Sequence, residues 1–173
     1  MTSYVALLRG VNLVGKSTLK MAELKRIASD LGLGQVRTYI ASGNLLFTSD
    51  KPEELLRRTL EKELQAHMSK EVRVMLRTAD ELEAILRANP FTDVPGNKVQ
   101  VFFLNEPPPV DLLETARNKA DDERIAAGAR EAFVAYGEKG IGRSRLRIPD
   151  AEAGTARNMN TVAKLAALAR EMS

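Results

Sequence analysis

An α+β fold made of two related halves, with mainly antiparallel sheets, is the fold class that three features of the sequence predict. The first is the order strand, helix, strand, strand, helix, strand over residues 1–78, which is the split βαβ or ferredoxin-like pattern. The second is a direct strand–turn–strand connection in each half, since hairpins make antiparallel pairs. The third is a partial repetition of the order, βαββα, over residues 79–173. We therefore expect two halves, 1–78 and 79–173, packed closely enough to count as one domain.

Apolar periodicity sets the elements of the first half. Gly32 and Gly34 end the first helix, whose apolar side chains recur at helical spacing. Asp50 and Glu53 have the spacing of a capping box, so the second helix is expected to begin there. The expected strands are 4–8, 36–41, 45–48 and 72–77, and the expected helices are 21–31 and from about 53 to 67.

The second half is less regular. Thr78 and Glu81 again have capping-box spacing, and the helix they begin ends before Asn89 and Pro90. A strong apolar run, VQVFFL, predicts a strand at 99–104, and Gly128 centres a hairpin. The other expected elements are a short helix at 110–118, the hairpin strands 123–127 and 132–136, a glycine-rich loop at 137–142 and a last amphipathic helix at 155–172.

Composition excludes several classes of protein. The 173 residues are 44% hydrophobic and 28% charged, which is ordinary for a globular chain. There is no Cys, which excludes disulfides and thiolate metal sites. No apolar run approaches the roughly 18 residues of a membrane span, and the N-terminal run is too short for a secretory signal, so we expect a cytoplasmic protein. A net charge of +3 and a pI of about 9.3 permit nucleic-acid binding without being its signature.

Residues 10–17 read GVNLVGKS and match the phosphate-binding P-loop pattern G-x-x-x-x-G-K-[ST]. In a P-loop the helix begins at the Gly-Lys-Ser itself, whereas the helical period here starts at about Met21. No buried strand ends on a carboxylate that would hold Mg²⁺, and direct hairpins conflict with the mainly parallel P-loop sheet. A P-loop NTPase is therefore the least favoured of three candidate functions.

Five segments together resemble one bacterial family, the uncharacterised domain of unknown function 1697. They are YVALLRGVNLVGKSTLKMAEL, VRTYIASGNLLF, NPF, GIGRSRL and TARNMNTVAKLAAL, and their order and spacing are similar to the family's across nearly the whole chain. The sequence departs from the family's usual residues at Val14, often Gly, and at Met159, often Trp. Family members commonly carry Asn where Ser17 stands, so the P-loop match is interpreted as local drift. The resemblance implies an α+β fold with ferredoxin-like halves and implies no activity.

Polar and glycine residues gather at one edge of the predicted first sheet. In a ferredoxin-like unit strands one and two run parallel on either side of strand three, so their carboxyl ends lie at the same edge. The positive N-terminus of the first helix starts there as well. Glycine turns, backbone amides and basic side chains suit a phosphate or carboxylate. The candidate ligand-binding residues of this cluster are Arg9, Gly10, Asn12, Gly15, Lys16, Ser42, Gly43 and Asn44.

A second cluster combines the glycine-rich loop with the start of the last helix. Arg143, Arg145 and Arg147 make this loop basic. The candidate ligand-binding residues are Gly140, Gly142, Ser144, Arg157, Asn158 and Asn160. A structural interpretation stays open for both clusters: the glycines supply turn geometry, the asparagines cap backbone, and Thr155 or Asn158 caps the last helix.

Other chemistries lack support. His67 is the only His and has no partner cluster, so we interpret it as a solvated helix residue, and we interpret Arg57, Arg58 and Lys62 as a solvated helix face. The sequence predicts no cofactor, no metal site and no membrane partner, and it leaves catalysis, catalytic residues and oligomeric state open. The favoured function is binding of an anionic, nucleotide-like small molecule, and the alternative is association with nucleic acid.

Overall fold

The structure is a computed structural model that describes residues 1–11, 19–40 and 43–173. Contacts within the chain divide it into two compact units. The first unit is Met1–Leu82 together with Leu165–Ser173, and the second is Glu83–Lys164. The end of the last helix thus groups with the first unit, whereas the sequence-based division placed it with the second half.

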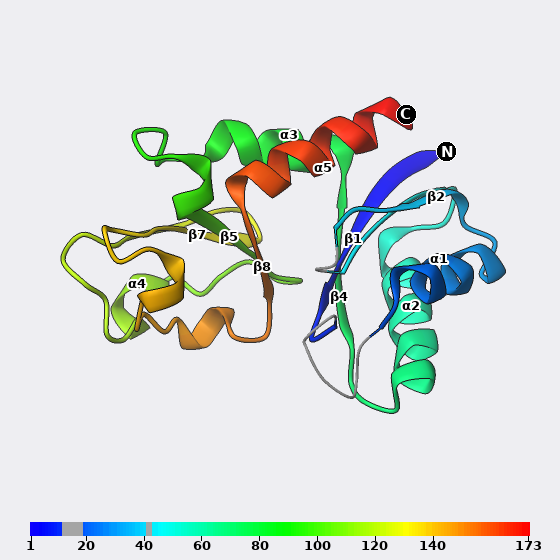
Figure 1. The fold of residues 1–173 in the computed structure, drawn as a ribbon, viewed down its shortest axis with the longest axis horizontal. Helices are drawn as coiled ribbons and strands as arrows, with labels where there is room; N and C mark the ends of the chain where they lie inside the picture. The colour runs from blue at the N-terminus through cyan, green and yellow to red at the C-terminus, as the bar shows by residue number, and fades with distance from the viewer. Residues whose placement is uncertain (12–18, 41–42) are drawn as a thin grey trace. The chain divides into compact units, whose positions relative to one another are not determined.

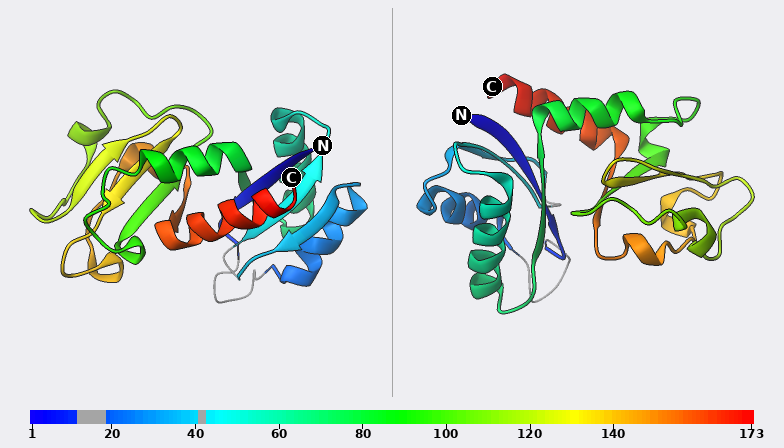
Figure 2. Two further views of the ribbon diagram at one scale, coloured as in Figure 1. Left: turned by 90° about the horizontal axis from the view of Figure 1, so that it is seen from above. Right: turned by 180° about the vertical axis from the view of Figure 1, so that it is seen from behind.

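The first unit has the predicted ferredoxin-like topology. Its four strands pair in the order β2-β3-β1-β4, and every neighbouring pair is antiparallel. Helices α1 and α2 lie on one side of this sheet (Figures 1 and 2). The elements are β1 (Thr2–Arg9), α1 (Met21–Asp30), β2 (Gly34–Thr38), β3 (Asn44–Ser49), α2 (Glu53–Met68) and β4 (Arg73–Thr78).

Apolar side chains of the helices and the sheet form the core of the first unit. Alternate residues of β1 point toward the helices, as the strand period of two requires. Helix α2 contributes Leu56, Leu60 and Leu64, which recur at helical spacing and are buried. The cluster also includes Tyr4, Ala6, Leu8, Leu24, Ile27, Leu45, Phe47, Val74 and Leu76. Both sheet faces of β1 are buried, since Val5 and Leu7 have no exposed surface either.

The two expected capping boxes have different outcomes. At Thr78 the prediction is confirmed, because Thr78 N donates to Glu81 Oε1 at 2.9 Å and Glu81 N donates to Thr78 Oγ1 at 3.2 Å. At Asp50 it is wrong, because α2 has Pro52 as its N-cap without a side-chain cap. The extended backbone that proline favours starts this helix. The Asp50 carboxylate instead lies 3.5 Å from the N-terminal ammonium group.

The second unit repeats the strand order of the first. Its sheet pairs as β6-β7-β5-β8, again antiparallel throughout. In place of a long second helix it carries short helical turns, and apolar residues such as Leu112, Tyr136 and Ile148 pack against the sheet. The elements from here to the C-terminus are α3 (Ala79–Ala88), η1 (Gly96–Lys98), β5 (Val99–Phe103), α4 (Leu112–Thr115), β6 (Arg124–Ala127), β7 (Glu131–Ala135), η2 (Ile141–Arg143), η3 (Pro149–Ala151), β8 (Thr155–Asn158) and α5 (Met159–Glu171).

Strand β8 corrects the prediction of one helix over 155–172. Thr155 to Asn158 pair with β5, with Thr155 opposite Phe103 and Arg157 opposite Val101. The helix begins only at Met159. Pairing with a buried neighbouring strand overrides the helical pattern of the following residues. The second unit is therefore β-α-β-β-β, with a closer likeness to the first unit than the sequence predicted.

The last turn of α5 is tied to the first unit by polar contacts. Arg170 forms an ion pair with Asp80 in the first turn of α3. Arg37 and Glu171 are 3.5 Å apart, and the hydroxyls of Ser3 and Ser173 share a hydrogen bond of 2.7 Å. In the part of the chain that the structure describes, no helix has the length and apolar character to cross a membrane.

Candidate anion site at the end of strand β1

The end of β1 and the start of β3 lie side by side, as the topology predicted. Leu7 is the register partner of Asn44, and Leu8 N donates to the carbonyl oxygen of Gly43 at 2.9 Å. Arg9 and Gly10 therefore leave the sheet beside the turn that contains Gly43. Four of the predicted site residues, Asn12, Gly15, Lys16 and Ser42, lie outside the described residues.

Gly43 and Asn44 build this turn. Gly43 has φ +79°, a conformation that favours glycine, and an added Cβ would lie 2.5 Å from Val11 Cγ2. Asn44 has no exposed surface, and its Nδ2 donates to Tyr39 O at 3.0 Å. These contacts match the structural interpretation of the two residues, which hold the turn against the end of β1.

Arg9 has a neighbour on β4 that was not among the predicted site residues. In the register of β1 with β4, Arg9 lies directly opposite Arg73, and both side chains are exposed. Directly opposed residues of an antiparallel pair have Cβ atoms about 5 Å apart, and like charges there are destabilising. Among the described residues no carboxylate forms an ion pair with Arg9. The ferredoxin-like frame carried a signal for this pair, because it places the end of the first strand beside the start of the fourth.

Lys70 adds a third cation next to Gly10. Ser69 closes α2 in the left-handed conformation, with φ +56°, and its N–H donates to Gln65 O at 2.9 Å. This reversal brings the half-buried Lys70 to the end of β1, where its Nζ donates to Gly10 O at 2.8 Å. Gly10, whose carbonyl oxygen accepts this hydrogen bond, has φ +78°, a backbone conformation that favours glycine.

The charge of this group is not balanced. Glu71 Oε1 lies 2.8 Å from Arg73 Nε and is the one carboxylate that pairs with the three cations among the described residues. Three positive charges and one negative charge leave a surplus of two at the end of β1. We name Arg9, Lys70, Arg73 and the Gly10 backbone the β1-end cluster.

Two of the three predicted residues of the glycine-rich loop, Gly140 and Ser144, form hydrogen bonds within the second unit. The Ser144 hydroxyl donates to the buried carboxylate of Glu123 and accepts from Leu146 N at 3.1 Å. Glu123 also accepts from Ala120 N at 2.9 Å. Gly140 has φ +71° and its N–H donates to Gly137 O, and Gly142 has open space around its Cα. Ser144 thus anchors the loop to the connection before β6.

The residues at the junction of β8 and α5 also have structural contacts. Arg157 is buried, and its Nη1 donates to Thr155 Oγ1 at 2.8 Å and to Ala156 O at 2.9 Å. Burial lowers the pKa of Arg157 to about 10, because the interior disfavours the charged guanidinium. Asn158 Oδ1 accepts from Thr161 N at 2.9 Å, so Asn158 rather than Thr155 caps the helix. Asn160 lies against Gly96, where an added Cβ would be 2.2 Å from Asn160 Oδ1.

His67 joins α2 to α1. Its Nε2 lies 3.3 Å from Glu23 Oε2, and this hydrogen bond lowers the pKa of the Glu23 carboxyl. Both side chains are partly exposed, so the pair contributes little to stability. Within the described ranges no group of three His, Asp or Glu side chains could hold a metal ion.

The P-loop interpretation is weakened further. Helix α1 begins at Met21, four residues beyond Ser17, with Lys20 as its N-cap and no side-chain cap. The first turn of a P-loop helix surrounds the Gly-Lys-Ser of the motif. The sheet that carries β1 is antiparallel throughout, whereas a P-loop sheet is mainly parallel.

The chain is thus an α+β protein whose two sheets have the same ferredoxin-like strand order and which carries a group of positive charges at the end of β1. The chain belongs to a family described as protein of unknown function, DUF1697, whose model matches residues 1–133. This match confirms the resemblance found in the sequence. Membership of this family assigns no activity to the chain, because the family is described as one of unknown function.

A solved structure supports the fold over nearly the whole chain. It is the structure of the conserved bacterial protein SP0830 from Streptococcus pneumoniae, which is 26% identical in sequence. The TM-score is 0.76, and the alignment covers 97% of this chain and 98% of that chain. A search of curated proteins found no match.

Proposed function

We propose that the protein binds a phosphate- or carboxylate-bearing small molecule at the β1-end cluster. One observation carries the proposal: Arg9 and Arg73 are opposed across β1 and β4 without an equal number of carboxylates. An anion between the guanidinium groups would replace repulsion by charge-assisted hydrogen bonds, and Arg is the side chain best suited to such contacts. The ligand would meet these cations in a cytoplasmic setting.

The structure of the pair also argues against a purely structural role for Arg9. A residue that is kept for folding is expected to stabilise its neighbours, whereas an exposed Arg opposite another Arg repels it. Lys70 increases the repulsion, and its hydrogen bond to Gly10 O uses only one of the three donors of its ammonium group. Ligand binding therefore explains the three neighbouring cations Arg9, Lys70 and Arg73 better than a contribution to the stability of the sheet does.

The test is isothermal titration of the protein with inorganic phosphate at low ionic strength. We expect saturable binding that Arg9→Gln weakens by about tenfold, the size of one lost hydrogen bond to a charged group. Lys164→Gln is the matched control, because Lys164 is an exposed helical residue of the second unit and the charge change is the same. Phosphate affinity that is equal in the two variants would reject the proposal.

Thermal melting in phosphate-free buffer separates a ligand site from a folding role. Arg9→Gln removes a like-charge contact, so we expect the melting temperature to stay unchanged or to rise. A fall of several degrees would assign Arg9 to folding instead.

The alternative, nucleic-acid association, rests on the pI of about 9.3 and the same basic residues. It predicts binding to RNA or DNA whose logarithmic affinity falls steeply with the logarithm of the salt concentration. Binding of inorganic phosphate without retardation of either nucleic acid at low salt favours the small molecule.

A further inference from the structure

Beside the β1-end cluster lies a hollow on the surface of α2. It is lined by the last three turns of the helix and the turn that follows it. The lining residues are Arg58, Glu61, Lys62, Gln65, Ala66, Ser69, Lys70 and Glu71. Lys70 belongs to both places, because it lines the hollow and its Nζ contacts Gly10 O at 2.8 Å.

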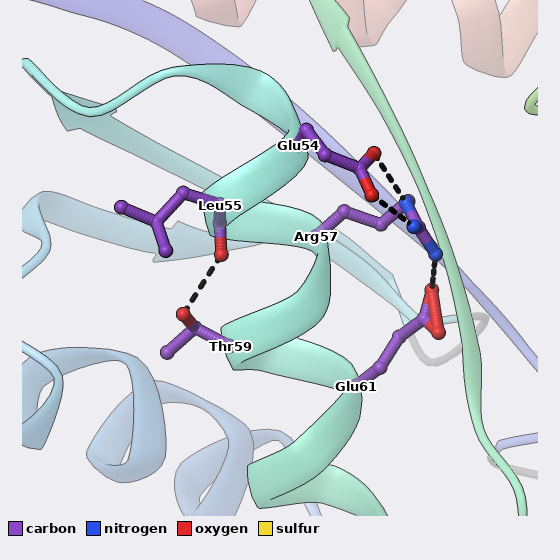
Figure 3. Close-up of polar contacts among 5 residues, drawn as sticks. All are labelled: Glu54, Leu55, Arg57, Thr59 and Glu61. Carbon is purple, nitrogen blue, oxygen red and sulfur yellow. Dashed lines mark hydrogen bonds and ion pairs between the residues drawn. The ribbon is translucent and has the colours of Figure 1, made fainter.

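The carboxylates of the hollow are engaged by other arginines. Glu61 Oε1 lies 2.7 Å from Arg57 Nη1, and Arg57 also pairs with Glu54, so one guanidinium joins two carboxylates along α2 (Figure 3). Glu71 pairs with Arg73 at 2.8 Å. Each acidic residue that lines the hollow therefore has a cationic partner outside it.

The basic side chains that line the hollow form no such ion pairs among the described residues. Across the described ranges, Lys62 and Lys70 have no carboxylate within ion-pair distance. The hydrogen bond from Arg57 is the main cause that lowers the pKa of Glu54, and Arg58 adds only a smaller, longer-range attraction. Arg58 and Lys62 are one helical turn apart, so their side chains share a face. The sequence predicted a solvated helix face, and Arg58 and Lys62 are indeed exposed; the structure adds that both line the hollow.

A chain of contacts connects the hollow to the β1-end cluster. Glu71 lines the hollow and pairs with Arg73, and Arg73 lies opposite Arg9. Lys70 makes the second connection, through Gly10. Two regions of positive charge thus meet at residues 70–73.

We propose that the hollow is a second anionic subsite, and that the ligand carries more than one phosphate group. This inference rests on the proposed function at the β1-end cluster. One phosphate is held between Arg9, Arg73 and Lys70, and the next is held by Lys70, Lys62 and Arg58. A single phosphate or carboxylate would leave the second region of positive charge without a counterpart.

The probes are inorganic phosphate, pyrophosphate and tripolyphosphate, titrated calorimetrically into the full chain without divalent metal. We expect affinity to rise by about tenfold from phosphate to the longer probes, because additional charge-assisted contacts form. The double variant Arg58→Gln/Lys62→Gln should lose this gain and keep the wild-type affinity for phosphate. Lys164→Gln, combined with Lys25→Gln on the exposed face of α1, gives the same charge change far from the hollow in sequence.

The outcomes separate the two proposals. Absence of phosphate binding in the wild type rejects the proposed function itself. In a second outcome, phosphate binding depends on Arg9 while pyrophosphate and tripolyphosphate bind no more tightly than phosphate. That result rejects the second subsite in the hollow and leaves the proposed function standing. In a third outcome, the double variant and its charge-matched control lose the higher affinity for the longer probes to the same extent. That result rejects the second subsite too, because it would show that affinity responds to net charge.

Discussion

Arg77 and Arg157 occupy the same position in the two sheets, each next to last in the fourth strand of its unit. Both are buried, with 0% and 7% of their surface exposed. In each case Nη1 donates to the carbonyl of the preceding residue at 2.9 Å. A helix-capping residue follows each arginine, Thr78 before α3 and Asn158 before α5. The chain therefore uses one strand-to-helix junction twice, which extends the likeness of the two units from topology to individual side chains.

Truncating either arginine should destabilise the protein strongly. Arg77→Ala and Arg157→Ala each leave a cavity and remove a hydrogen bond to a backbone carbonyl, so we expect losses of about 2–4 kcal/mol in the free energy of unfolding. Arg145→Ala, at an exposed position, should change it by less than about 0.5 kcal/mol. Urea unfolding of the three variants checks this. Losses no larger than that of Arg145→Ala would show that the buried guanidinium groups are dispensable.

The two caps should have similar effects. Thr78→Ala and Asn158→Ala each remove an acceptor for a first-turn N–H, and we expect each to cost about 1 kcal/mol. Thr59→Ala is the control, because the Thr59 hydroxyl donates to Leu55 O inside α2 and caps nothing (Figure 3). Its effect on the urea midpoint should be clearly smaller. A control as costly as the caps would mean that side-chain truncation, not capping, is being measured.

Two glycines at the end of β1 offer a matched comparison. Gly10 and Gly43 both have positive φ, near +78°, but an added Cβ at Gly10 meets open space, whereas at Gly43 it meets Val11 and Leu8. Gly10→Ala should cost about 1–2 kcal/mol from backbone strain alone. Gly43→Ala should cost about 1–3 kcal/mol more because of overpacking. Equal melting temperatures for the two variants would contradict the packing of the Gly43 turn against β1.

Tyr136 should make stability depend on pH. Burial, with a smaller contribution from Glu123, raises the pKa of Tyr136 from 10.0 to about 12. A phenol with a raised folded pKa stabilises the fold fully below its unfolded pKa, and this stabilisation is lost as pH rises through the folded value. The difference in unfolding free energy between wild type and Tyr136→Phe should therefore shrink between about pH 10 and 12. A constant difference over that range would show that Tyr136 titrates normally.

The sequence predicted the order of the elements in the first unit, because most of them have a clear apolar period, although the second strand lies at Gly34–Thr38 and not at the expected 36–41. It failed at β8, because a four-residue strand followed directly by an amphipathic helix has too few residues to show a period of two. It also assigned a capping role to Asp50, although Pro52 starts the helix. At β8 the pairing with β5 decides the local structure, whereas at α2 the extended backbone of Pro52 decides where the helix begins.

The candidate site was predictable only in part. The proximity of Arg9 and Gly10 to Gly43 follows from topology alone. The pairing of Arg9 with Arg73 depends on the register of two strands that are far apart in sequence, and the contact of Lys70 with Gly10 depends on a left-handed residue at Ser69. Neither dependence is visible in composition or periodicity.

Anion binding by the positive charge at the end of β1 can be followed residue by residue when ¹⁵N-labelled protein is titrated with inorganic phosphate and its amide resonances are recorded. We expect saturable shifts concentrated at residues 9–10 and 70–73, and smaller shifts in Arg9→Gln. Shifts confined to residues 140–144 and 157–160, or no saturable shifts at all, would contradict it.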